Sequence, residues 1–334
     1  MNNFSLKTII SILFVFNSLN IACQTISNVY SEQDGSTIRV HYSLITAVPC
    51  DIEFLVSQDG GATWKGPLTK VQGSVGKGII GGEHHISWQV LEEMLELDGD
   101  NIQFRIAAYS KKPYEPEMVL VEGGGFMMGN NNGEDDEKPM HEVELNPYYI
   151  GKFEISQTQW VAIMGNNPSY FKDCDQCPVE NVSWLDVEEF LKKINKQTGK
   201  DYRLPTEAEW EFAARGGNVN KGYLYSGGND LGSLAWFTDN GGSRTHSTGS
   251  KHANELGVFD MSGNVWEWCN DWYGPYSIAF SRDPQGASSG QAHVIRGGGW
   301  NMDLSHCRVS TRDWNYPDLK NSIIGFRVAS STVR

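Results

Sequence analysis

The last third of this chain contains no long stretch with the periodicity of a helix. From Gly217 onwards, glycines, aromatic residues and short apolar runs follow one another. Long surface helices need an apolar stripe that repeats with the helical period, and this region offers none. The 334 residues include 36 glycines and 11 tryptophans, which is typical of a loop-rich fold anchored by large aromatic side chains.

Three shorter helices are predicted upstream by their capping residues. Ser156-Gln-Thr-Gln159 is a capping box, and the helix that it opens is expected to end near residue 165. Ser183 is expected to cap a second helix over 183–199, and Thr206 a third over 206–216, each ended by a glycine. One face of the second helix collects the apolar residues Val187, Phe190, Leu191 and Ile194.

Residues 24–112 have a different pattern, with apolar residues alternating in short runs separated by glycine-containing turns. The clearest runs are 37–43, 52–57 and 101–107. Period-two alternation with regular turn signals predicts an all-β domain, a small immunoglobulin-like sandwich. The polar segment Lys111–Glu117 carries two prolines, so we place a linker at 113–117 and a second domain at 118–334.

Residues 1–23 resemble a secretory signal peptide. Lys7 precedes an apolar run over 9–16, and small residues lead to Cys23. Cleavage before Gln24 predicts an exported protein that is periplasmic, cell-surface or secreted, and no later apolar stretch is long enough for a transmembrane helix. A lipid anchor at Cys23 is the alternative, but Asn20 stands where a lipobox has an aliphatic residue.

The net charge restricts the class of possible partners, and the cysteine content restricts the possible disulfides and thiols. The net charge of −14 argues against a nucleic-acid partner, because phosphate binding needs a basic surface. Removal of the signal leaves five cysteines, an odd number in a compartment that permits disulfides. Cys174-Asp-Gln-Cys177 fits a zinc half-site, a redox dithiol, a small loop disulfide or no bond at all, and without a second ligand pair the last two are favoured. The other three cysteines are Cys50, Cys269 and Cys307.

Four motifs follow one another in a fixed order along the second predicted domain. They are RLPTEAEWEFAARG (203–216), DMSGNVWEW (260–268), RGGGWNMDLSHCR (296–308) and GFRV (325–328). In this combination the chain resembles the formylglycine-generating-enzyme family, also called sulfatase-modifying factors, from about residue 118 to residue 328. The resemblance implies a compact, loop-rich α+β domain, a variant of the C-type-lectin fold.

The resemblance also implies where the catalytic cysteine pair would lie, and it shows that one of the two cysteines is replaced. In the copper-dependent oxidases of this family, a Cys-x4-Cys pair follows Arg-Gly-Gly, and the two positions with that spacing here are Met302 and Cys307. Two thiolates hold Cu(I), whereas the thioether of Met302 coordinates weakly and cannot be deprotonated. Copper is therefore expected only if Cys307 works with an unusual partner. A disulfide between Cys269 and Cys307, which would remove that thiol, is the favoured interpretation.

The same resemblance implies a structural calcium ion at the motif that begins at Asp260. The ligands would be the side chains of Asp260 and Glu267 and the backbone carbonyls of Gly263 and Val265. Oxygen ligands on a tight turn suit calcium, which accepts flexible coordination.

Three functions remain open from the sequence. The first is an exported binding or accessory module without the oxidase site, acting on a protein, peptide or glycan ligand. The second is a working oxidase that converts a sulfatase cysteine to formylglycine. The third is a lectin-like protein whose variable carboxy-terminal face recognises a ligand through Trp300, Asn301, Asp303, His306, Asp313, Trp314, Asn315 and Tyr316.

Overall fold

The computed structural model describes residues 25–46, 49–93, 102–110 and 114–331, and the predicted signal peptide and Cys23 lie outside these ranges. The chain divides into two compact units, Met1–Lys112 and Pro113–Arg334. None of the helices in the described ranges has both the length and the apolar content that a membrane span needs.

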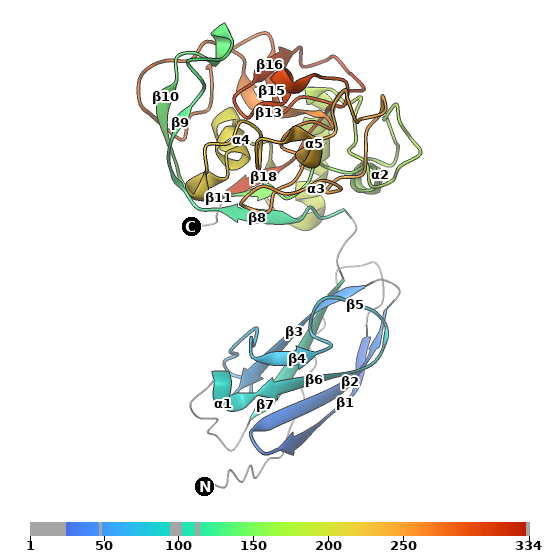
Figure 1. Ribbon diagram of the computed structural model, residues 1–334. Helices are drawn as coiled ribbons and strands as arrows, with labels where there is room; N and C mark the ends of the chain where they lie inside the picture. The colour runs from blue at the N-terminus through green and yellow to red at the C-terminus, as the bar shows by residue number, and fades with distance from the viewer. Residues whose placement is uncertain (1–24, 47–48, 94–101, 111–113, 332–334) are drawn as a thin grey trace. The chain divides into compact units, whose positions relative to one another are not determined.

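The first unit consists of two antiparallel sheets with one apolar core (Figure 1). Strands pair in the orders β1-β2-β6-β4 and β5-β3-β7. Every second residue of β3 is buried, so Ile52, Phe54 and Val56 meet Tyr42 and Trp88 from the other sheet. The elements are β1 (Thr25–Asp34), β2 (Thr37–Ile45), β3 (Cys50–Ser57), β4 (Val71–Gly73), β5 (Gly76–Ile79), β6 (Gly82–Gln89), α1 (Val90–Glu93) and β7 (Gln103–Ser110).

This arrangement confirms the alternating strands expected for 37–43 and 52–57. The immunoglobulin-like topology stays a prediction.

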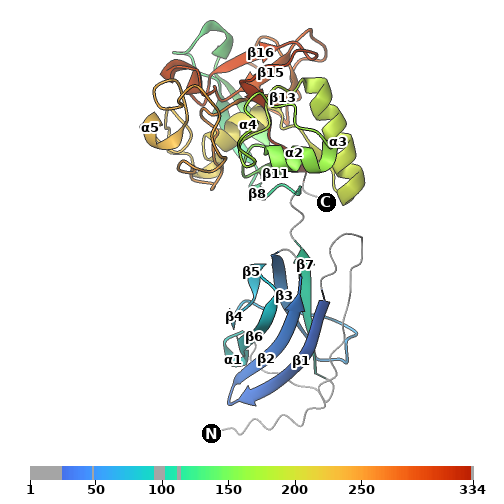
Figure 2. The same cartoon turned by 90° about the vertical axis from the view of Figure 1, so that its right-hand side faces the viewer.

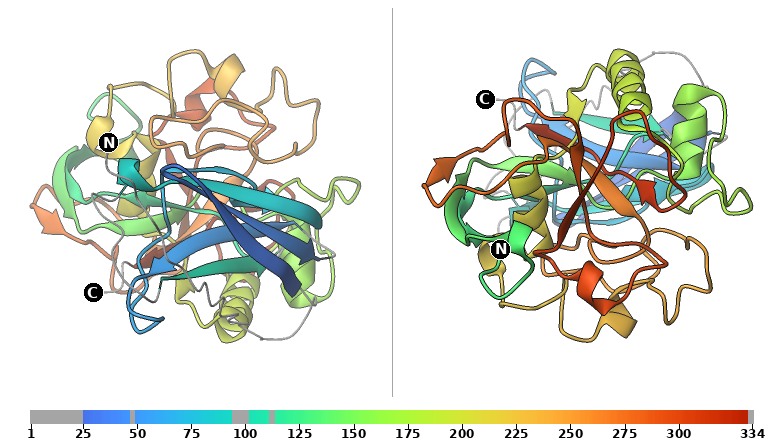
Figure 3. Two further views of the ribbon diagram at one scale, coloured as in Figure 1. Left: turned by 90° about the horizontal axis from the view of Figure 1, so that it is seen from below. Right: turned by 90° about the horizontal axis from the view of Figure 1, so that it is seen from above.

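The second unit combines three small sheets with short helices and long loops. The sheets have the strand orders β14-β10-β9, β12-β18-β11-β8 and β16-β15-β13-β17. The strands are β8 (Met118–Val121), β9 (Gly124–Met128), β10 (His141–Leu145), β11 (Tyr148–Gly151), β12 (Tyr202–Arg203), β13 (Trp266–Trp272), β14 (Ser281–Arg282), β15 (His293–Arg296), β16 (Arg312–Asn315), β17 (Ile324–Gly325) and β18 (Ala329–Ser331). The tract between α4 and β13, yellow to orange in Figure 3, has little regular structure.

The three predicted helices are confirmed. Each begins with the capping box that its sequence indicates, at Ser156, Ser183 and Thr206. The first two end at a glycine with left-handed backbone, whereas the third ends at Ala214, with Arg215 as its C-cap. The helices are α2 (Gln157–Met164), α3 (Trp184–Thr198), α4 (Glu207–Ala214) and α5 (Leu231–Leu234), with 3-10 turns η1 (Asp135–Glu137), η2 (Gly217–Val219) and η3 (Leu304–Cys307).

Helix packing follows the apolar face of α3. Phe190 stacks on Trp160 of α2 with ring centroids 5.3 Å apart, and α2 and α3 lie side by side in Figure 2. Phe326 meets both rings edge-on. Aromatic contacts of this kind add stability beyond the burial of area, so these rings fasten the two helices to the carboxy-terminal segment.

Three buried arginines join the loops of the second unit. Each arginine donates hydrogen bonds to one carboxylate and to two backbone carbonyls. Arg296 binds Glu211, Val309 and Thr311; Arg312 binds Glu207, Asp136 and Gly274; Arg327 binds Glu267, Gly151 and Phe259. Loops need partners for their backbone groups when they are buried, and the planar guanidinium supplies several donors at once.

Candidate functional site

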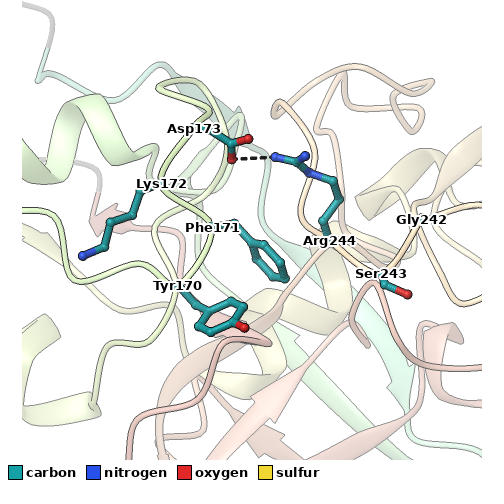
Figure 4. Close-up of a pocket in the computed structure, with 7 residues that line it drawn as sticks. All are labelled: Tyr170, Phe171, Lys172, Asp173, Gly242, Ser243 and Arg244. Carbon is teal, nitrogen blue, oxygen red and sulfur yellow. Dashed lines mark hydrogen bonds and ion pairs between the residues drawn. The ribbon is translucent and has the colours of Figure 1, made fainter.

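A surface pocket of about 550 Å³ lies between two loops of the second unit (Figure 4). One wall is Tyr170–Asp173 and the other is Gly242–Arg244. The guanidinium of Arg244 reaches across to the carboxylate of Asp173, with an N to O distance of 2.7 Å, while Lys172 points away from this pair. Tyr170 is 72% exposed, so the pocket offers an accessible aromatic ring beside an ion pair.

The first wall is fixed through its backbone. The amides of Tyr170 and Phe171 donate to the two oxygens of the buried Glu180 carboxylate at 3.0 and 2.9 Å. Burial raises the pKa of Glu180, and these two amides act in the opposite direction by favouring its charged form. The side-chain amide of Gln157 donates to the carbonyl of Phe171 at 2.7 Å. The backbone of this wall is therefore held in place independently of its side chains.

The second wall is a tight turn that passes close to another segment. The amide of Gly241 donates to the carbonyl of Phe237 at 2.6 Å. A Cβ atom at Gly241 would stand 2.8 Å from the carbonyl oxygens of Phe237 and Trp300, so only glycine fits there. His246 donates through Nε2 to the Gly241 carbonyl at 2.8 Å, which fixes the far side of the turn.

Trp300 connects the pocket to the carboxy-terminal segment. Its ring meets Phe171 edge-on with centroids 5.5 Å apart, and its indole nitrogen donates to the carbonyl of Ser322. Trp300, one of the residues predicted for a ligand face, is thus in contact with a pocket wall. Asn301, Asp303 and His306 are exposed around η3, and Trp314 and Tyr316 are exposed on and beside β16 with ring centroids 5.4 Å apart.

The Cys307 thiol is enclosed by apolar side chains. Cys307 has no exposed surface and shares a cluster with Tyr225, Leu231, Leu234, Ala235 and Phe237, against which Met302 packs. Burial, with a smaller contribution from the Asp303 carboxylate, raises the pKa of Cys307 to about 12. At neutral pH this residue is therefore a thiol rather than a thiolate. Neither Met302 nor Cys307 is among the described residues that line the pocket.

The predicted disulfide between Cys269 and Cys307 is wrong. Both are free thiols in the structure, and they belong to different core clusters. Cys50 is also buried. The bond in the described chain joins Cys174 to Cys177, which is the small loop disulfide among the alternatives for that motif.

A second group of polar residues is buried at the motif that begins at Asp260. The carboxylate of Glu267 is bound by Arg327 through two contacts of 2.6 Å and by the indole of Trp210 at 2.8 Å. Asp260 accepts from the amide of Gly249 through Oδ2, whereas its buried Oδ1 has no hydrogen-bond partner. Glu154 lies in the same group and accepts from Asn264.

These carboxylates outnumber the arginine that faces them. Burial raises the pKa of Asp260 to about 6, although the hydrogen bond from Gly249 opposes the shift. Burial also raises the pKa of Glu154 well above its usual range, and the charges of Asp260 and Glu267 add to the effect. Burial therefore favours the protonated, neutral forms of Glu154 and Asp260 over their charged forms.

Comparisons with known proteins assign the second unit. Residues 103–332 match the family described as Sulfatase-modifying factor enzyme 1-like domain. The chain belongs to this family. It is 33% identical over 244 residues to the chaperone protein LppX of Paenibacillus barcinonensis, covering 58% of this chain and 82% of LppX. It is 29% identical over 284 residues to the formylglycine-generating enzyme of Streptomyces coelicolor, covering 64% of this chain and 88% of that enzyme.

A solved structure agrees with this assignment. Treponema denticola variable protein 1 matches with a TM-score of 0.61 and 31% identity, covering 64% of this chain and 95% of that protein. The second unit therefore has the fold of sulfatase-modifying-factor-like proteins, and its mixture of small sheets, few helices and long loops agrees with the C-type-lectin-like expectation.

For this member of the sulfatase-modifying-factor family, the calcium ligands expected from the motif fit in part. Asp260 fits, because a buried carboxylate oxygen without a partner is suited to a hard cation. Glu267 fits poorly, because Arg327 and Trp210 already occupy both of its oxygens. Within the described ranges, no three His, Cys, Asp or Glu side chains gather closely enough to hold a metal ion. A cation here would depend on carbonyl oxygens as well.

Proposed function

We propose that this chain is a binding or accessory member of the sulfatase-modifying-factor family that lacks the dithiolate oxidase site. The observation that carries the proposal is the state of the two positions with catalytic spacing. Met302 has no thiol, and Cys307 is a buried thiol whose pKa is raised to about 12. A buried, protonated thiol is neither a good copper ligand nor a good nucleophile. The relative LppX, which is named a chaperone, supports an accessory role.

A copper and substrate assay tests the loss of oxidase activity. The purified chain is titrated with Cu(I) under anaerobic conditions and then given oxygen and a Cys-x-Pro-x-Arg peptide. We expect no one-to-one thiolate complex in the absorption spectrum and no aldehyde product by mass spectrometry. Tight Cu(I) binding together with aldehyde formation would overturn the proposal in favour of an active oxidase.

The oxidase alternative makes a separate demand on Cys307. It requires this thiol to react in the folded protein, so alkylation of the native chain followed by peptide mass mapping is a direct comparison. We expect Cys307 to be labelled only after unfolding. Rapid labelling of Cys307 in the folded chain would support the oxidase.

We place ligand binding in the pocket between Tyr170–Asp173 and Gly242–Arg244. An exposed aromatic ring next to an exposed ion pair suits a peptide or glycan, since such ligands use ring stacking and hydrogen bonds together. Peptide and glycan arrays would identify a ligand. The substitutions Tyr170→Ala and Arg244→Ala should each lower the affinity of the chain for that ligand. Arg282→Ala is the matched control, because Arg282 forms an exposed 2.8 Å ion pair with Glu144. Binding lost in the control but kept in the pocket variants would exclude the pocket.

The variable lectin-like face is the second candidate for the ligand site. It is favoured by the exposure of Trp314 and Tyr316, at 42% and 43%, because large exposed aromatic residues are characteristic of recognition surfaces. A double Trp314→Ala and Tyr316→Ala substitution that abolishes ligand binding, with Tyr170→Ala unaffected, would move the site to this face.

Calcium is proposed as a structural ion held by Asp260 with the carbonyls of Gly263 and Val265. The unpartnered Oδ1 of Asp260 and the unbalanced carboxylates support it. Calcium bound to the folded state would stabilise the fold, and this stabilisation rises with the logarithm of the free calcium concentration. We expect EDTA to lower the melting temperature of the second unit and excess calcium to restore it. An unchanged melting temperature in EDTA would contradict this proposal.

Export and the architecture of the first unit are proposed with the same function. A disulfide at Cys174 and Cys177 is typical of an oxidising compartment, which supports a cleaved leader at 1–23. A mature chain that begins at Gln24, measured by intact mass after expression in the native host, is the expected result. An immunoglobulin-like sandwich in the first unit would serve as a docking module for the binding domain.

A further inference from the structure

The disulfide-closed loop Cys174–Cys177 directly follows the first pocket wall. Cys177 is 1% exposed and Cys174 is half-buried, so one sulfur is accessible and the other is covered. The Cys174–Cys177 motif therefore lies next to the site proposed for ligand binding, and the proposed binding function assigns it no role.

Three consecutive carbonyls of this loop accept hydrogen bonds from two separate segments of the chain. The carbonyls of Asp175 and Cys177 accept from the amides of Thr158 and Gln157, at 3.0 and 2.9 Å, at the start of α2. The carbonyl of Gln176 accepts from the amide of Thr248 at 3.0 Å. The loop thus joins α2 to the segment that follows the second pocket wall.

Few other contacts between the described residues hold the two walls together on this side. Asp173 and Arg244 form the ion pair described above, but both side chains are largely exposed, and exposed pairs contribute little stability. Cys174 Sγ lies 3.5 Å from the hydroxyl of Ser247. The covalent bond between Cys174 and Cys177 closes the loop that presents the Gln176 carbonyl to the Thr248 amide.

We propose that the Cys174–Cys177 bond is a redox modification site that controls the spacing of the pocket walls. In the oxidised form the loop holds Thr248 and keeps Asp173 within reach of Arg244. In the reduced form the carbonyl of Gln176 is released, the two walls separate, and the pocket loses its shape for the ligand. The control of ligand binding by the disulfide rests on the proposed binding function. The movement of the loop on reduction does not depend on that function.

The reductant belongs to the class of protein or small-molecule dithiols. Its thiolate attacks Sγ of Cys174, the accessible sulfur, and the bond to Cys177 breaks as Cys177 leaves as a thiolate and takes up a proton. The second thiol of the reductant then attacks the mixed disulfide and releases Cys174 as a thiol. The protein gains two electrons and two protons, and the dithiol becomes a disulfide.

Hydrogen exchange on the whole chain tests the loop movement without any ligand. The probe is dithiothreitol, and mass mapping after alkylation confirms that Cys174 and Cys177 have been reduced. We expect exchange at the Thr248, Gln157 and Thr158 amides to become at least about tenfold faster, while amides inside α3 keep their rates. Unchanged exchange at Thr248 with both cysteines alkylated would overturn the proposal.

Two variants distinguish the effect of losing the Cys174–Cys177 bond from other effects of dithiothreitol. Cys174→Ser with Cys177→Ser should show fast exchange at Thr248 without reductant and no further change with it. Asp173→Asn removes only the ion pair and should keep the response of Thr248 to reductant. A double variant that exchanges as slowly as the oxidised wild type would also refute the proposal. If the loop responds but the ligand identified on arrays binds equally in both forms, the binding site lies elsewhere, and the pocket assignment fails instead.

Discussion

The two units of this chain solve the same problem of burial in different ways. In the described part of the first unit, the buried polar side chains are Ser43 and Ser57, and the core is otherwise apolar. The second unit buries a large set of ionisable side chains: Glu137, Glu154, Glu180, Glu207, Glu209, Glu211, Asp260, Glu267, Asp271, Arg296, Arg312 and Arg327. Continuous strands pair their own backbone groups, whereas irregular loops need side chains to do so.

The difference predicts that the two units respond unequally to substitution. An apolar core loses stability gradually as atoms are removed, because neighbouring side chains relax in part. A buried arginine that has lost its carboxylate keeps an uncompensated charge and strains every loop that it joins. Calorimetry of the whole chain is the appropriate measurement, since each unit has its own core and is expected to give its own transition.

The largest effect is expected for Glu267→Ala. This change leaves Arg327 buried without its carboxylate and should cost about 3–5 kcal/mol, lowering the transition of the second unit. Glu144→Ala is the control, because its pair with Arg282 is exposed to solvent and should contribute little to stability. Equal effects of the two substitutions would contradict the role given to the buried arginines.

Asp271 should make the second unit sensitive to pH. Burial, followed by the charge of Glu207, raises the pKa of Asp271 to about 8 from an ordinary value of 3.8. The folded state holds this proton more tightly than the unfolded state, so the stabilisation is complete below pH 4 and is lost as the pH rises to 8. The wild type should lose about 3 kcal/mol relative to Asp271→Asn between pH 5 and pH 7. Parallel pH profiles for the two proteins would refute the shift.

Cys307→Ser tests the apolar cluster behind the second pocket wall. A hydroxyl without a partner in this cluster should cost about 2 kcal/mol, measured by denaturant unfolding. Because Cys307 forms no disulfide, dithiothreitol should leave the size of this effect unchanged. Met302→Cys restores the Cys-x4-Cys spacing but should give no aldehyde-forming activity, since the Cys307 thiol stays buried.

The smallest effect is expected in the apolar core of the first unit. Ile52 is 1% exposed, and Ile52→Val removes one methyl group from the interface of the two sheets. The cost should be about 1 kcal/mol, confined to the transition of the first unit. A shift of the second transition by the same substitution would show that the units are energetically coupled.

Local signals gave the elements that the sequence could predict. Ser156, Ser183 and Thr206 each lie within three residues of the partner that completes their capping box, so the three helices could be recognised. Alternation in β2 and β3 likewise shows which residues face the core. The family motifs were informative because several short patterns occur in one order, which neither composition nor periodicity could supply.

The candidate site was harder to predict because its contacts join distant segments. Asp173 and Arg244 are 71 residues apart, and no short pattern marks either one. Glu267 was expected to bind calcium, but its partner Arg327 lies 60 residues further on. The predicted disulfide between Cys269 and Cys307 was wrong for the same reason, because contacts between distant segments leave no local pattern. Both cysteines were expected near one predicted site, but that does not establish that their thiols are in contact. The role of Glu154 was also missed.

Glu180 fixes the backbone of the first pocket wall without fixing the side chains that this wall presents. Its carboxylate binds the amides of Tyr170 and Phe171, so the backbone position does not depend on which side chains those two residues carry. An exposed residue such as Tyr170 can then be exchanged without disturbing the loop. Selection, in a laboratory library or among natural variants, could retune what this pocket recognises by single substitutions, while any change at Glu180 itself would remove the frame on which every such variant is built.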